Sequence, residues 1–391
     1  MTRPLQLFVC LTTLAGAALA QTTIEPAFNR PSTTVAYIYV QTTKGVKVYD
    51  ASSLGKLTEV SGSPFKTTGA MIGSNGTHFI TLGTDYVHSY PVASNGAIEE
   101  QASEIDTRSY SGANCGTTRG GVLFGQDVYV ALTNAAKDGA GTGVCDALQT
   151  FRVPNTGTPA FLGSTVFDTD DPFVVGTITL PVLSGNGAFA YAVEAEGHGA
   201  CEDTIATFAG NSSVLDLTIF GGEIGPIAEQ NQLYFPTPLM ATDASNHLAM
   251  VMFSEATAPC GASFPPQIAS FTVGSKGELT STNTFENMPV VEMTGNQLMN
   301  ISPSGEVLAL TVGSGIQFFH FNGAEPVTKF TGTIGTTGRI VSMRWDNSNH
   351  LYAVNGASGK LHVYTVTPAS VVEAAGSPYA IGAEGVTVVS K

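Results

Sequence analysis

Two glutamates, a histidine and an arginine are the residues of this 391-residue chain best suited to chemistry. Glu196 and His198 follow one apolar run, Glu255 follows another, and Arg119 precedes a third. A carboxylate or an imidazole can act as a general base toward water, and a guanidinium can stabilise an oxyanion. The set could therefore hydrolyse a lactone. The same groups could equally bind a cation or a sugar, or be exposed acids and bases on an acidic protein.

These candidates fall in or beside three loops that are expected to be long. The loops cover residues 134–146, 196–203 and 255–267. Each contains one cysteine, namely Cys145, Cys201 and Cys260. A fourth cysteine, Cys115, lies a few residues before Arg119. Long loops that are fastened together favour a functional site, although they could also do no more than complete an irregular rim.

The strands that must position these loops come from an internal repeat. An aliphatic residue with an aromatic residue three positions later recurs seven times, from Val46 with Tyr49 to Leu361 with Tyr364. A second apolar run precedes each pair, and six of the seven units have a third run that ends in a hairpin turn. A more polar fourth strand follows. Four antiparallel strands repeated every 40 to 60 residues or so predict the blades of a β-propeller.

The two ends of the chain complement each other. The first unit lacks its leading strand, whereas Val386–Val389 remains after the last unit is complete. We predict one all-β domain over residues 35–391, a single seven-bladed β-propeller with four antiparallel strands per blade, preceded by an extended lead-in at residues 21–34. The C-terminal strand would complete blade one and close the ring, which removes two free edges. Two stacked β-sandwiches also have short strands, but they predict neither the repeat nor the matching ends.

The first twenty residues have the pattern of a secretory signal peptide. Arg3 precedes an apolar stretch, and Ala18-Leu19-Ala20 forms a small-residue cleavage site before Gln21. The apolar stretch of about 15 residues is shorter than the roughly 20 that span a bilayer. We therefore expect residues 1–20 to be removed and the product to be secreted or periplasmic, with no membrane insertion.

Cleavage removes Cys10 and leaves four cysteines in an oxidising compartment, so we expect two disulfides. Sequence alone permits three connectivities. Cys115 and Cys145 belong to one predicted blade, and Cys201 and Cys260 to equivalent loops of the next two, which favours Cys115 with Cys145 and Cys201 with Cys260. Pairing Cys145 with Cys201 would leave the other two to bridge two blades, beyond the roughly 4.4 to 6.8 Å Cα separation of a disulfide.

The charge of the chain restricts its partners. It has 31 acidic and 16 basic residues, a net charge of −15, which argues against nucleic acid and anionic membranes because both attract clustered Lys and Arg. No CxxC pair occurs, and the acidic cluster of Asp168, Asp170 and Asp171 lacks the glycine and distal glutamate of an EF-hand loop. We expect no metal, no cofactor and a monomer.

The repeat resembles the lactonase-type seven-bladed propellers, the 6-phosphogluconolactonase-like family, and their relatives with YVTN-type repeats. The similarity covers roughly residues 35 to 391. It rests on Ser302-Pro303-Ser304-Gly305, His350-Leu351-Tyr352-Ala353-Val354-Asn355, Leu361-His362-Val363-Tyr364, and the blade ends Gly62-Ser63-Pro64-Phe65 and Gly376-Ser377-Pro378-Tyr379. WD40 propellers would show repeated Trp-Asp pairs, and quinone-dependent propellers repeated tryptophans, whereas this chain has one Trp.

The resemblance implies a propeller but no particular reaction. The family includes hydrolases of sugar lactones, muconate-cyclising enzymes and envelope proteins without an assigned activity, and no catalytic set can be matched residue by residue. We expect a lactonase-like propeller that binds a protein partner or a small neutral, carbohydrate-like ligand without catalysis. The alternative is a lactone hydrolase or cycloisomerase at the channel mouth, with Glu196, Glu255, His198 and Arg119 as its candidates. The acidic charge opposes anionic sugar-acid substrates.

Overall fold

A computed structural model describes the compact unit from Thr33 to Lys391, apart from some internal segments. The described residues are 33–110, 117–133, 145–168, 177–178, 180–195, 204–209, 217–220, 232–256, 263–294 and 297–391. The predicted signal peptide at 1–20 and nearly all of the lead-in at 21–34 lie outside them. No helix in the described part of the chain is long and apolar enough to cross a membrane.

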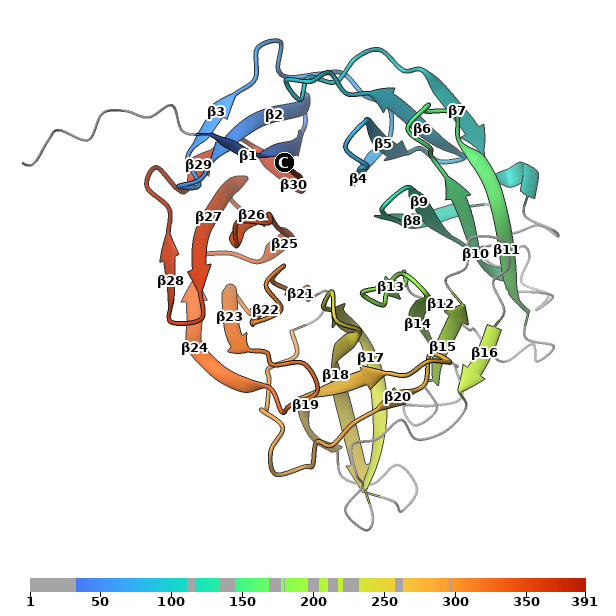
Figure 1. The fold of residues 1–391 in the computed structure, drawn as a ribbon, viewed down its shortest axis with the longest axis vertical. Coiled ribbons are helices and arrows are strands. Elements are labelled where there is room, and N and C mark those ends of the chain that lie inside the picture. The colour runs from blue at the N-terminus through green and yellow to red at the C-terminus, as the bar shows by residue number, and fades with distance from the viewer. Residues whose placement is uncertain are drawn as a thin grey trace, which may run out of the picture. The chain divides into compact units, whose positions relative to one another are not determined.

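Regular structure in the described residues is β-strand, apart from one short 3-10 helix at Arg108–Tyr110. The strands form seven antiparallel sheets arranged as a propeller (Figure 1). Six of them are blades built from one continuous stretch of chain each, and the remaining sheet joins the two ends. The all-β propeller architecture expected from the repeat is therefore confirmed.

The first three continuous blades span residues 70–220. One contains β4 (Ala70–Ser74), β5 (His78–Leu82), β6 (Tyr86–Pro91) and β7 (Ser103–Asp106). The next contains β8 (Thr117–Phe124), β9 (Asp127–Thr133), β10 (Cys145–Arg152) and β11 (Ala160–Asp168). The third contains β12 (Thr177–Ile178), β13 (Val182–Leu183), β14 (Phe189–Ala195), β15 (Thr204–Ala209) and β16 (Leu217–Phe220).

The other three continuous blades follow. One contains β17 (Gln232–Thr242), β18 (His247–Ala256), β19 (Ser263–Val273) and β20 (Leu279–Thr280). The next contains β21 (Met299–Ile301), β22 (Val307–Val312), β23 (Gly315–His320) and β24 (Thr328–Gly335). The last contains β25 (Ile340–Trp345), β26 (His350–Asn355), β27 (Lys360–Thr367), β28 (Ser370–Glu373) and β29 (Tyr379–Ala380).

The composite sheet brings together strands from the two ends of the unit. Its order is β3 (Leu57–Glu59), β2 (Gly45–Ser52), β1 (Thr34–Thr42) and β30 (Ala383–Ser390). Tyr37 pairs with Val389, and Val40 pairs with Val386, so the surplus C-terminal strand lies where the first unit lacked one. The expected pairing of the two ends is confirmed. The expected count of seven blades depends on this sheet, because only six blades are continuous in sequence.

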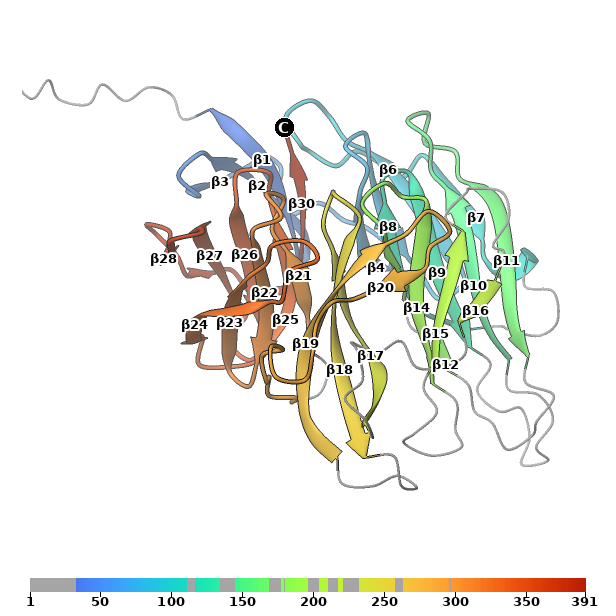
Figure 2. The ribbon, with the colours of Figure 1, turned by 60° about the horizontal axis from the view of Figure 1, so that its bottom comes forward.

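The core lies between neighbouring sheets, which stand side by side around a common axis (Figure 2). Val307, Phe318, Met343 and Leu351, for example, pack together from two adjacent blades. The repeated aromatic residue contributes to this packing, as the sequence predicted. It is buried in each repeat where its side chain is described, at Tyr49, Tyr90, Phe151, Phe271, Phe319 and Tyr364. The aromatic series is therefore core and not a ligand-binding surface.

Two of the inner hairpin turns share the pattern Asp-x-Ser-Asn-His. Asp346 Oδ1 accepts hydrogen bonds from the backbone N–H groups of Ser348 and His350. Its Oδ2 accepts another from Nδ1 of the His350 ring, at 2.8 Å. Asn349 has a φ of 59°, a left-handed conformation that asparagine tolerates well. The turn that begins at Asp243 repeats this arrangement. These short polar segments therefore set where the innermost strands end.

Candidate functional site

Two of the four candidate catalytic residues, Glu196 and His198, lie outside the described residues. Arg119 and Glu255 are described by their backbone only. Arg119 lies on β8, the innermost strand of its blade, at an irregularity in the pairing with β9. Glu255 lies near the end of β18 and pairs with Leu233 and Ser263. Whether the four side chains meet stays a prediction.

The predicted disulfides also involve residues that are not described or are described by their backbone only. Cys115, Cys201 and Cys260 lie outside the described residues, and Cys145 is described by its backbone alone, as the first residue of β10. Cys10 belongs to the predicted signal peptide. The pairings Cys115–Cys145 and Cys201–Cys260 therefore remain predictions.

The loop expected over residues 255–267 was too long. Strand β18 continues to Ala256 and β19 already begins at Ser263, so Glu255 is a strand residue. Strand β19 contains Pro265 and Pro266, neither of which can donate to a sheet. They are accommodated at a register shift between β18 and β19, where the ladder is interrupted.

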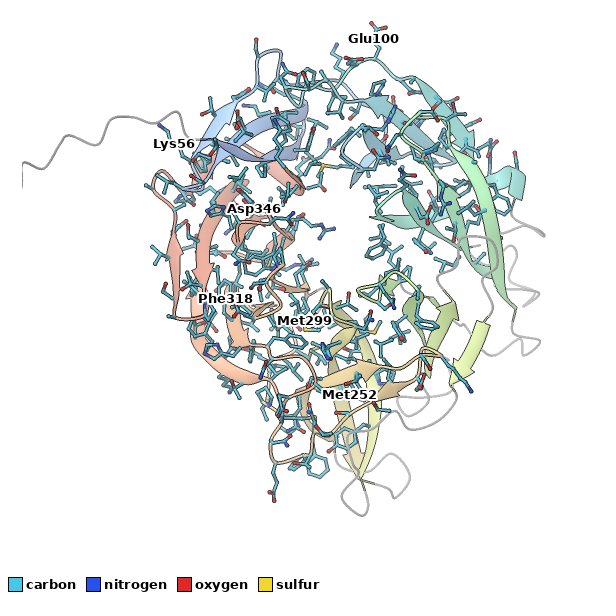
Figure 3. All side chains as sticks on the ribbon, in the orientation of Figure 1. Lys56, Glu100, Met252, Met299, Phe318 and Asp346 are labelled. Carbon is cyan, nitrogen blue, oxygen red and sulfur yellow. The ribbon has the colours of Figure 1, made fainter. Side chains whose placement is uncertain are left out.

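A cavity of about 470 Å³ lies between the innermost strands of five blades and faces the axis of the propeller. It is called the channel cavity here. Most of the residues that line it are apolar, and Met299 from β21 lies on the inner side of the ring (Figure 3). Further apolar lining comes from Val122, Leu123, Val182, Leu239 and Ile301. Such a volume and composition are typical of small-ligand sites.

Arg344 is the charged residue among those that line the channel cavity. It is partly buried on β25, and its Nη1 donates a hydrogen bond of 2.8 Å to the carbonyl oxygen of Met343. The ion pairs of the described residues do not include it. Burial lowers the pKa of the Arg344 guanidinium. A cation in this environment is stabilised when an anion binds beside it.

Asn300 lies close to Arg344, because both side chains reach the carbonyl of Met343, which is 43 positions from Asn300 in the sequence. The Asn300 Nδ2 donates to the same Met343 carbonyl oxygen, at 3.4 Å. An amide and a guanidinium on neighbouring strands β21 and β25 therefore converge on one acceptor. The second lining amide, Gln297, is occupied by bonds to the carbonyl oxygens of Glu292 and Thr311. Arg344 and Asn300 are thus the polar groups placed to meet a ligand.

A second cavity of about 570 Å³ lies beside the turns of two neighbouring blades. Its charged residues, Arg152 and Asp127, form two hydrogen bonds with each other, at 2.7 and 2.9 Å. The Asp127 carboxylate raises the pKa of Arg152, and burial raises the pKa of Tyr129 to about 12. Because these charges satisfy each other, the channel cavity is the better candidate site.

Within the described residues, no group of three or more His, Cys, Asp or Glu side chains is arranged to hold a metal ion. Asp168 ends β11 and its side chain is not among those described, while Asp170 and Asp171 lie outside the described residues. Sequence reasoning missed Arg344 and Asn300. The available signal was a single charged residue, Arg344, inside the mostly apolar run Ile340–Trp345, just before the hairpin turn at Asp346.

Comparison with known proteins supports the fold. The chain is similar to solved structures of putative 6-phosphogluconolactonases from Bacteroides fragilis (TM-score 0.60, 11% identity, covering 93% of this chain and 100% of that one) and Bacteroides uniformis (TM-score 0.55, 14% identity, 91% and 100%). No protein-family description and no curated protein matches it. At these identities the likeness establishes a lactonase-like propeller fold alone.

Proposed function

We propose that this protein is a secreted or periplasmic lactonase-like propeller that binds a small ligand in its channel cavity without catalysing a reaction. One observation supports this proposal above others. The described residues that line the cavity include an arginine and an asparagine but no carboxylate, imidazole or thiol. Such a lining can hold and orient a molecule, but it lacks the general base that hydrolysis requires.

We also propose that the composite sheet closes the ring as a seventh blade. The supporting observation is that Ser342 on β25 bonds the backbone of Val386 on β30 in both directions, with Val386 N donating at 3.0 Å and Ser342 Oγ donating at 3.2 Å. The composite sheet is therefore connected to the last continuous blade through its C-terminal strand.

Lactone hydrolysis is the second candidate function, because two similar structures are named as putative lactonases. Its residues would be Glu196, Glu255, His198 and Arg119 at the channel mouth. Purified mature protein should show no turnover on a panel of neutral and acidic sugar lactones. Robust turnover that is abolished by Glu196→Gln or His198→Ala, but retained in the surface control Glu100→Gln, would establish the enzyme instead.

If the protein is exported, its four remaining cysteines are expected to be oxidised to two disulfides. Protein recovered from the medium or periplasm should begin near Gln21, and non-reducing peptide mapping should find Cys115 joined to Cys145 and Cys201 joined to Cys260. The pairing of Cys145 with Cys201 would contradict the proposed connectivity. Four free thiols in the exported protein would contradict the oxidising compartment as well.

A further inference from the structure

We propose that the ligand of the channel cavity is a small monocarboxylate with an apolar body, and that Arg344 binds its carboxylate. This inference rests on the proposed binding function and adds the chemical class of the ligand. It does not follow from the overall charge of −15, which disfavours anions in general. The groups around Arg344 determine which ligand charge is favoured in the cavity. Short-range contacts in a partly buried site are screened less by salt than the long-range field of the whole protein.

Most donors of the Arg344 guanidinium have no partner among the described residues. Of its five N–H groups, the structure assigns one to the carbonyl oxygen of Met343. Arg152, by contrast, is held by both oxygens of Asp127. The planar fork of an arginine matches the two oxygens of a carboxylate better than any neutral acceptor. Burial lowers the pKa of Arg344, because the charged guanidinium loses part of its hydration. A carboxylate that binds beside it would offset this desolvation cost.

Asn300 extends the site by one donor. Its Nδ2 and the Arg344 Nη1 share the Met343 carbonyl as acceptor, at 3.4 and 2.8 Å, which places the amide beside the guanidinium. The long Asn300 bond is easily exchanged for a shorter one to a charged oxygen. We therefore expect the ligand carboxylate to lie between these two side chains.

The remaining lining determines the rest of the ligand. Leu180 and Val182 present apolar surface to the cavity, and the nearly buried Met299 forms part of its wall. A phosphorylated sugar acid carries several charges and hydroxyl groups, and one guanidinium with one amide cannot satisfy them. A single carboxylate on an aliphatic or aromatic body fits both the charge and the apolar lining. The volume of about 470 Å³ limits that body to a small molecule.

The test uses four probe acids, hexanoate, octanoate, benzoate and phenylacetate, each with its primary amide as a neutral counterpart of similar shape. Binding to the full mature protein is measured by ligand-observed NMR and by calorimetry. We expect at least one acid to bind and its amide to bind at least about tenfold more weakly, because a charge-assisted bond would be lost. Inorganic phosphate should compete poorly, since it gains nothing from the apolar lining.

Three variants test whether Arg344 and Asn300 bind the carboxylate of the acid. Arg344→Gln should weaken binding of the acid at least about tenfold while leaving binding of the amide unchanged. Lys329→Gln removes the same charge from an exposed position on the outer strand β24, so it should leave both unchanged. Asn300→Asp places a carboxylate beside Arg344 and should abolish binding of the acid by occupying the guanidinium. Thermal melting confirms that each variant is folded.

The possible failures are distinguishable. If an acid and its amide bind equally and Arg344→Gln changes neither, the channel binds ligands but the carboxylate inference is wrong. If neither acids nor amides bind, whereas a neutral sugar binds, the ligand class is wrong and the binding function stands. If none of these probes binds to the folded protein, the proposed function fails with the inference. Competition by phosphate as strong as by the acids would contradict the apolar body.

Discussion

Protein that lacks residues 385–391 is expected to melt at least about 10 °C lower than the full chain. The deletion removes most of β30, including Val386 and Val388, which pack between the composite sheet and its neighbour. Burial of each such side chain contributes roughly 1.5–3 kcal/mol, and 1 kcal/mol shifts the melting temperature of a large domain by roughly 2–4 °C. The loss also exposes the hydrogen-bonding edge of β1 from Ala36 to Gln41.

The effect should extend beyond the composite sheet. Val386 also exchanges two hydrogen bonds with Ser342, so the deletion separates the last continuous blade from the composite sheet. Removal of Lys391 alone is the matched control. It removes one backbone bond to Val35 and the contact with Tyr37, and should change the melting temperature by only a few degrees. Unchanged melting of the longer truncation would contradict the closure of the ring by β30.

Replacement of Asp346 by alanine should be the most damaging single substitution in the hairpin turns, at a cost of about 3–5 kcal/mol. Asp346 is fully buried and accepts four hydrogen bonds, from the backbone of Ser348 and His350, the His350 ring and, at 3.0 Å, the hydroxyl of Tyr352. Burial, followed by the nearby Asp346 charge, raises the pKa of Tyr352, which keeps its hydroxyl protonated as a donor. Loss of the carboxylate leaves these donors buried and unpaired.

The chain offers its own matched control for this experiment. Asp243 holds the equivalent turn through the same three bonds to Ser245 and His247, but no tyrosine hydroxyl of the described residues bonds its carboxylate, and His247 is 24% exposed. Asp243→Ala should therefore lower the melting temperature less than Asp346→Ala. Equal shifts, or a cost for Asp346→Ala below about 1 kcal/mol, would show that the buried network contributes little.

Much of the fold could be predicted because it depends on local patterns. The repeated aliphatic and aromatic pairs identify strands that must bury one face, and Tyr49, Phe151 and Phe319 are buried as that pattern requires. Turn sequences such as the one at Asp346 mark where strands reverse, since their side chains bond backbone groups within five residues. The loop at residues 255–267 was misjudged because a register shift accommodates prolines in a way that composition does not reveal.

The candidate site could not be predicted in this way. The sequence alone determined the strands, the buried aromatic residues, the hairpin turns and the pairing of the two ends, because each depends on neighbouring residues or on an unpaired edge. Only the tertiary structure decided that Arg344 lies beside Asn300 at one Met343 carbonyl, and that both face an apolar cavity. A residue on an innermost strand meets residues of other blades only when the sheets are arranged around a common axis. The spacing within one repeat carries no information about that arrangement.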